Sequence, residues 1–84
     1  MISLQQNRID FSDAGKSIRI LSVVYASRQK QQKSNLTKID AGAIGLVKVR
    51  IWDPSFNNEY YLIQLSIEGQ IYYCKLARTM IEFI

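Results

Sequence analysis

The chain of 84 residues contains no histidine and a single cysteine, Cys74. Without histidine, a catalytic triad built on imidazole or a zinc site with histidine ligands cannot form. One cysteine excludes an internal disulfide and a thiolate metal cluster, and it agrees with a reducing compartment. The seven acidic residues are scattered along the chain, without the spacing that presents two carboxylates from one element. We therefore expect no catalytic residue, no metal site and no cofactor, and we interpret the chain as non-enzymatic.

Long apolar runs are also missing. A membrane span needs about 20 predominantly apolar residues, and runs such as residues 23–26 fall far short of that length. Residues 1–6 lack the basic and apolar regions of a signal peptide, which predicts a cytoplasmic protein. The length predicts one domain over residues 1–84. A hydrophobic fraction of 48% is typical of a globular chain and argues against disorder.

Several segments show the composition and the alternation of β-strands. Residues 17–25 are β-branched and aromatic without glycine or proline, and they predict one strand. A short strand is expected at 8–11, before a turn at 12–15. Residues 47–52 and 60–68 alternate with a period of two and predict two further strands.

The strand at 47–52 has two chemically different faces. One face is apolar and consists of Val47, Val49 and Ile51. The other face is basic and aromatic and consists of Lys48, Arg50 and Trp52. Burial in a core does not by itself explain the residues of this basic and aromatic face.

The turn after residue 67 can be chosen by the faces that it creates. A two-residue loop at 69–70 sets three apolar pairs opposite one another, because residues that oppose each other in an antiparallel pair point to the same face. Glycine at the first loop position suits a type II′ turn, while a turn at 68–69 preserves the same faces. A three-residue loop would bring Lys75 onto the apolar face. We therefore predict an even loop, with pairs Ile67–Tyr72, Leu65–Cys74 and Ile63–Leu76 and with Cys74 buried.

The order of these elements resembles that of an SH3-like barrel over residues 16–84. It consists of a strand, a long loop, a strand, a distal turn, a strand, a tight hairpin, a strand, a short helical turn at 77–79 and a closing strand from Met80. A small antiparallel sheet with one apolar face is stable when it curls and shields its edges. The expected fold is therefore all-β, a five-stranded antiparallel SH3-like barrel. An OB-like barrel that includes the amino-terminal strand is the alternative.

Positive charge is concentrated in one part of the chain. Residues 14–38 carry six cations and no acid, whereas the remainder has five cations and seven acids, a net charge of −2. This polarisation predicts contact with nucleic acid or with an acidic protein surface. The alternative is a solvated loop that basic and amide side chains keep soluble. The candidate contact residues in this loop at 28–38 are Arg28, Lys30, Lys33 and Lys38.

Aromatic residues supply the second candidate feature. Tyr60 and Tyr73 are expected on the same face of the sheet as Lys48, Arg50 and Trp52. Aromatic rings beside cations stack and neutralise single-stranded nucleic acid, and they also form the centres of protein interfaces. Alternatively, the barrel buries these rings.

These features predict a non-catalytic adaptor or regulatory protein that binds a protein partner or associates with itself. The alternative is a nucleic-acid-binding protein that uses the basic loop at 28–38 and the Lys48, Arg50 and Trp52 face. The nearby acids Asp53, Glu59 and Glu68 weaken that alternative, because they repel phosphate.

Overall fold

The computed structural model describes residues 8–28, 36–53 and 58–84. These residues form an all-β structure, which confirms the predicted fold class. Its single helical element is the short 3-10 turn η1 (Arg78–Met80), close to the helical turn predicted at 77–79. The strands are β1 (Arg8–Asp10), β2 (Ser17–Ile20), β3 (Val24–Ala26), β4 (Thr37–Ile39), β5 (Ile44–Asp53), β6 (Asn58–Ile67), β7 (Gln70–Ala77) and β8 (Ile81–Phe83).

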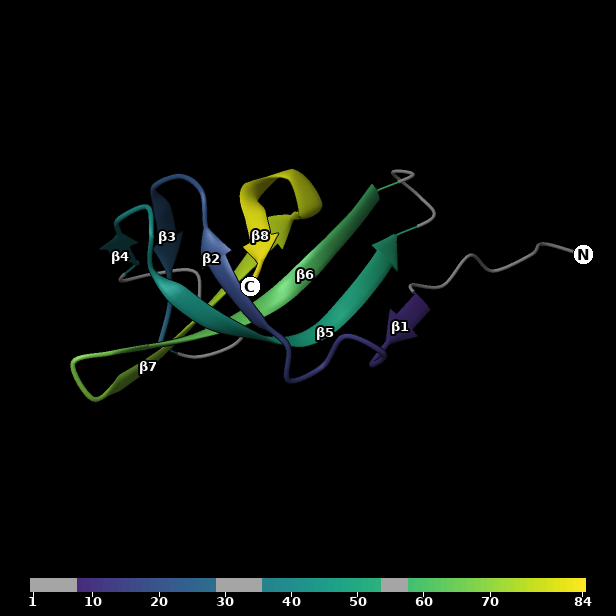
Figure 1. Ribbon diagram of the computed structural model, residues 1–84, viewed down its shortest axis with the longest axis horizontal. Helices are drawn as coiled ribbons and strands as arrows, with labels where there is room; N and C mark the ends of the chain where they lie inside the picture. Colours follow the sequence, from purple (N-terminus) through teal and green to yellow (C-terminus); the bar gives the residue numbers. More distant parts are fainter. Residues whose placement is uncertain (1–7, 29–35, 54–57) are drawn as a thin grey trace, which may run out of the picture.

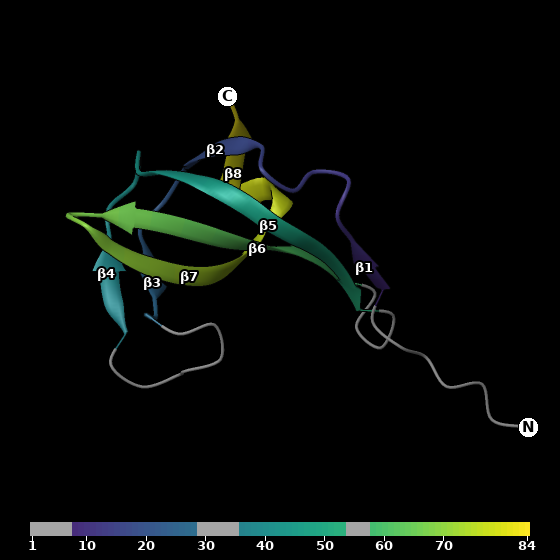
Figure 2. The same cartoon turned by 90° about the horizontal axis from the view of Figure 1, so that it is seen from below.

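All strand pairs are antiparallel, and most belong to one curved sheet with the order β7-β6-β5-β2-β8 (Figures 1 and 2). The short strand β1 lies beside the far end of β5, while β3 and β4 pair with each other at the opposite end of the molecule. The two sheets meet at Ser27, whose backbone N–H and C=O both bond to Tyr73 of β7.

Within the described residues the sheets do not close into a barrel, so neither the SH3-like barrel nor the OB-like barrel is confirmed. The single strand predicted at 17–25 is interrupted at residues 21–23, where Leu21 and Val23 are exposed. This break places β2 in the large sheet and β3 in the small one. Because β3 then reaches β7 only through Ser27, the continuous ladder that closure requires is missing there.

The hydrophobic core lies between the concave face of the large sheet and the β3–β4 pair. Central strands contribute alternate residues to it, as a half-buried antiparallel sheet requires. On β6, Ile63 and Leu65 are fully buried and Tyr61 nearly so. The other members of the core are Ile18, Ile20, Val24, Ala26, Ile39, Val47, Cys74, Leu76 and Ile81.

A glycine allows β5 to approach β6 closely at the centre of this core. Gly45 pairs with Leu65, and a Cβ atom on Gly45 would lie 2.7 Å from a methyl group of Leu65 and 2.8 Å from the carbonyl oxygen of Gln64. Both distances are shorter than real Cβ contacts. The absence of a side chain at position 45 therefore provides the space that Leu65 fills.

The β6–β7 hairpin turns at Glu68–Gly69 and not at the favoured position 69–70. Both turn residues have positive φ, 50° for Glu68 and 79° for Gly69, which is the type I′ geometry that suits the twist of a two-residue hairpin. The predicted pairs are shifted by two residues on β7, so that Leu65 lies opposite Tyr72 and Ile63 opposite Cys74. An even shift preserves the faces, and the predicted apolar face is confirmed.

Cys74 is buried in the core, as predicted, and burial raises the pKa of its thiol to about 11. We expect the native protein to react with a thiol reagent at neutral pH only as fast as it unfolds, because the thiolate is the nucleophile and the core excludes the reagent. The measurement is the rate of labelling by a disulfide reagent, with and without denaturant. The denatured chain is the control, and equally fast labelling of the native protein would place Cys74 at the surface.

Candidate binding surfaces

A β-bulge in β5 divides the predicted basic and aromatic face into two. Val47 pairs with Ile63, but Val49 pairs with Leu62, so Lys48 is an extra residue in the ladder. Since paired residues point to the same face, the insertion reverses the alternation beyond it. Lys48 and Val49 lie on the face opposite the core, whereas Arg50, which pairs with Tyr61, lies on the core side.

The prediction that Lys48, Arg50, Trp52, Tyr60 and Tyr73 share one face is therefore wrong. Trp52 pairs with Glu59, and Tyr60 pairs with Ile51, so the two aromatic rings lie on opposite faces of the sheet. Tyr73 pairs with Gln64 and lies on the same side as Tyr60. An unbroken period of two cannot anticipate this division, because one inserted residue changes the face of every residue after it.

The first surface is the side of β5, β6 and β7 that faces away from the core, which we call the outer face. It is largely apolar, although one face of an antiparallel sheet is commonly polar. Val49 lies on this side and is only 8% exposed, although it does not belong to the core cluster. The exposed apolar residues here are Ile44 (47%), Leu46 (41%) and Ile71 (38%). The half-buried ones are Ile51, Tyr60, Leu62 and Tyr73.

Two lysines accompany these apolar residues on the outer face. Lys48 and Lys75 are both exposed, and both belong to the row of Leu62, which pairs with Val49 beside the bulge and with Lys75 on β7. The ammonium group of Lys75 lies 5.5 Å from the ring centroid of Tyr60, within cation–π range. The outer face thus combines an apolar surface with positive charge.

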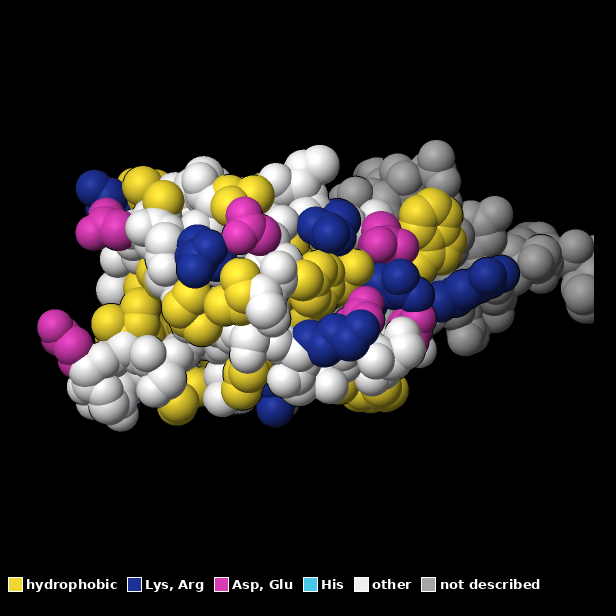
Figure 3. All heavy atoms as spheres, in the orientation of Figure 1, with side chains coloured by type: hydrophobic (Ala, Val, Ile, Leu, Met, Phe, Trp, Pro, Cys, Tyr) yellow, Lys and Arg dark blue, Asp and Glu magenta, His cyan; other side chains and the backbone are white. Residues whose placement is uncertain are grey.

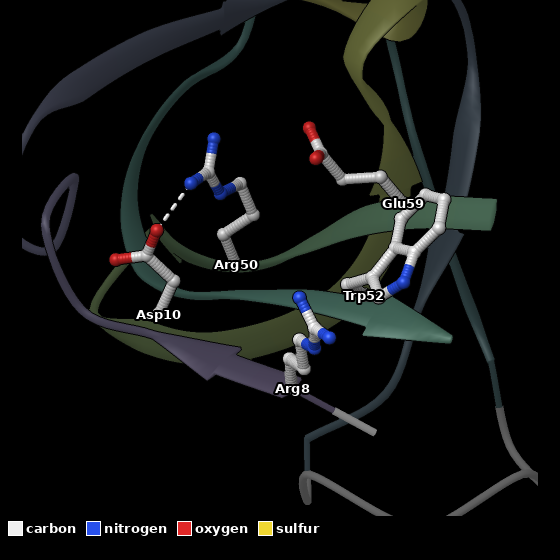
Figure 4. Close-up of a pocket in the computed structure, with 5 residues that line it drawn as sticks. All are labelled: Arg8, Asp10, Arg50, Trp52 and Glu59. Carbon is white, nitrogen blue, oxygen red and sulfur yellow. Dashed lines mark hydrogen bonds and ion pairs between the residues drawn. The ribbon is translucent and has the colours of Figure 1, made fainter. Parts of the chain in front are cut away.

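The second surface is a hollow in the part of the sheet that extends beyond the core, which we call the arm. The arm consists of β1 with residues 50–53 of β5 and 58–60 of β6. Figure 3 shows basic, acidic and hydrophobic side chains side by side at this end (right). The hollow has a volume of about 280 Å³ (Figure 4), and its lining residues are Arg8, Asp10, Arg50, Trp52 and Glu59.

Asp10 and Arg50 are fixed in this hollow by one another. They form an ion pair, and the other carboxylate oxygen of Asp10 accepts a hydrogen bond of 2.8 Å from the backbone N–H of Ser12. The bonds from Ser12 and the Arg50 guanidinium lower the pKa of Asp10 to about 2, so the carboxylate is ionised at neutral pH. Hydrogen bonding to Asp10 in turn raises the pKa of Arg50, with a smaller contribution from Glu59.

Of the remaining candidates, two belong to the residues that the structure describes. Arg28 is exposed at the end of β3, and Lys38 is exposed on β4, so the predicted loop at 28–38 includes a strand. Lys30 and Lys33 lie outside the described residues. Two other cations of the basic segment are paired with acids, Lys16 with Asp13 at 2.8 Å and Arg19 with Glu82 at 3.0 Å.

Sequence reasoning missed Arg8, Asp10 and Glu59 in the hollow and Lys75 on the outer face. Arg8 and Asp10 belong to the predicted strand at 8–11, but nothing in the sequence specifies that this strand pairs with the end of β5. Lys75 could have been found, because the predicted hairpin already places it on the face opposite Cys74.

In the part of the chain that the structure describes, no three potential ligands lie together in a way that could hold a metal ion. The same part contains no helix with the length and apolar character needed to cross a membrane. Comparison of the chain with protein-family models, with curated proteins and with solved structures found no match.

Proposed function

We propose that this chain is a non-catalytic adaptor or regulatory module of the cytoplasm that docks on a protein partner through its outer face. The observation that supports this proposal is that the sheet of β5, β6 and β7 is apolar on both sides. The core covers one side, while Ile44, Leu46 and Ile71 on the other side are exposed. Contiguous apolar surface of this kind is typical of interaction sites.

The area of the outer face agrees with the lower end of the range that specific protein–protein interfaces bury. Three strands at a spacing of about 4.8 Å and about ten residues at 3.3 Å each give a flat area of roughly 500 Å². Two such surfaces together approach the roughly 1,000 Å² expected of a biological interface. Tyrosine, enriched at the centres of interfaces, is present as Tyr60 and Tyr73.

The charges favour a partner with an apolar surface bordered by carboxylates over a second copy of the chain. Lys48 and Lys75 are both in the row of Leu62. A symmetric dimer centred on this row would bring the lysines of the two copies together, and like charges oppose such an interface. The carboxylates of an acidic partner would instead form ion pairs with these lysines.

The test uses Leu46→Glu and Lys75→Glu, with Lys38→Glu, an exposed position on β4 of the small sheet, as the matched control. A partner isolated with the wild-type chain should bind both outer-face variants about tenfold more weakly, a loss of about 1.4 kcal/mol of binding free energy. It should bind the control variant as tightly as the wild-type chain. Binding of the wild-type chain should weaken as salt increases. Equal binding by all three variants would contradict the proposal, as would a wild-type dimer in sedimentation that Leu46→Glu dissociates.

Nucleic-acid binding is the second candidate, and the cation–π pair of Lys75 with Tyr60 favours it. A base stacked on an exposed tyrosine beside a lysine is the usual arrangement in single-strand binding. A salt series with single-stranded DNA and RNA separates the two candidates. If the chain binds these nucleic acids and its affinity falls steeply with salt, the result supports nucleic-acid binding. If it shows no measurable binding to them, the result supports the protein partner.

A further inference from the structure

One row of side chains across the arm carries a cation, an indole ring and a carboxylate in that order. Arg8 of β1 pairs with Trp52 of β5, and Glu59 of β6 pairs with Trp52 from the other side. Residues paired in this way point to the same face. All three side chains line the hollow, and the strand that carries Trp52 lies between the strands that carry Arg8 and Glu59 (Figure 4).

The neighbouring row is already neutralised. Asp10 pairs with Arg50 in the ladder and holds its guanidinium in an ion pair. This contact leaves Arg8 and Glu59 as the two charges of the hollow without an ion pair among the described residues. They lie on the two outer strands of the arm, with the indole of Trp52 on the strand between them.

The sum of the charges decides which ligand fits. Two arginines and two carboxylates line the hollow, so its net charge is zero. A lone anion is attracted by Arg8 but repelled by Glu59. A lone cation is attracted by Glu59 but repelled by Arg8. A ligand that carries both charges at the right separation gains two attractions, and its own net charge is also zero.

We propose that the hollow binds a zwitterion whose ammonium and carboxylate groups are joined by a short apolar chain. Arg8 receives the carboxylate, Glu59 receives the ammonium group, and the chain between them packs on Trp52. A cation near an indole face gains further stabilisation. The strands that carry Arg8 and Glu59 lie two spacings apart, about 10 Å between Cα atoms, so the hollow spans a molecule longer than an α-amino acid.

This chemistry has two sources, a free ω-amino acid and the carboxy-terminal lysine of a polypeptide. The lysine side chain places an ammonium group several carbons from the terminal carboxylate, as a free ω-amino acid does. The inference does not depend on the outer face, because the hollow lies on the other side of the sheet.

Tryptophan fluorescence provides a direct measurement, because Trp52 is the only tryptophan in the chain. The probes are glycine, 5-aminopentanoate and 6-aminohexanoate, with pentanoate and pentylamine as analogues of single charge. A peptide that ends in lysine and its carboxy-terminal amide complete the set. We expect saturable changes with the two longer amino acids and with the free peptide. We expect weaker binding, by about fivefold or more, of glycine, of the single-charge analogues and of the amide.

Two variants test whether Arg8 binds the carboxylate of the ligand and Glu59 binds its ammonium group. Arg8→Gln should weaken binding of the zwitterion about fivefold without weakening that of pentylamine, because Arg8 repels a lone ammonium group. Glu59→Gln should weaken binding of the zwitterion without weakening that of pentanoate, because Glu59 repels a lone carboxylate. Lys48→Gln, on the outer face, is the control and should bind all probes normally. Tighter binding of the peptide than of the free amino acids identifies a polypeptide as the source, and the reverse order identifies a small molecule. Equal responses to zwitterions and single-charge analogues, or no saturable response, would overturn the proposal.

Discussion

Replacing Gly45 by valine is expected to remove most of the stability of the fold. The new Cβ atom would lie 2.7 Å from a methyl group of Leu65 and 2.8 Å from the backbone oxygen of Gln64. The methyl group can rotate away, but the carbonyl group belongs to the ladder between β5 and β6 and cannot move without breaking it. Overpacking of this kind costs about 3 kcal/mol, a large share of the stability of a small domain.

Urea denaturation of the purified variant measures this effect. Leu46→Val is the matched control, since Leu46 is the next residue of β5 and is 41% exposed on the outer face; we expect it to change stability by about 0.5 kcal/mol or less. If Gly45→Val unfolds at the same urea concentration as the wild-type chain, β5 and β6 lie farther apart at Gly45 than the structure shows.

Leu65→Ala has the second largest expected effect. Leu65 is fully buried and packs in the core, where Gly45 of β5 makes room for it. Truncation of a buried leucine costs about 2–5 kcal/mol, since the lost burial adds to the cost of the cavity that remains. The melting temperature and the urea midpoint should both fall.

The same substitution at Leu46 gives the comparison, because Leu46 is half-exposed on the outer face. We expect Leu46→Ala to cost less than about 1 kcal/mol. If Leu65→Ala does not fold, Leu65→Val still tests the assignment through a smaller loss. A larger loss of stability at Leu46 than at Leu65 would mean that the two faces of the sheet are assigned the wrong way round.

Local alternation was sufficient to predict much of the fold. The period of two in β6 and the apolar pairing with β7 placed Leu65 and Cys74 in the core correctly, because both follow from side-chain geometry within one hairpin. The break at residues 21–23 could not be predicted, since Leu21 and Val23 are as apolar as the strand residues beside them. Their exposure depends on which sheet each half joins, a non-local choice.

The candidate sites were less predictable for the same reason. Trp52 and Arg50 were recognised as residues without a role in the core, but their face was inverted by the bulge at Lys48. Their neighbours Arg8 and Asp10 come from a strand at least 40 positions away, and only the pairing of β1 with β5 brings them together. Composition identified the residue types, and topology decided which of them meet.

The bulge makes the chemistry of the arm depend on the register between β5 and β6 as well as on residue identity. If Lys48 paired with Leu62 in a regular ladder, every following residue of β5 would be turned over at once. Val49 and Ile51 would then enter the hollow, while Arg50 and Trp52 would join Tyr60 on the opposite side. Deletion of Lys48 would instead remove the extra residue and leave Val49 opposite Leu62 and Arg50 opposite Tyr61. The contents of the two surfaces are therefore set by one unpaired residue, whose side chain belongs to neither the core nor the hollow.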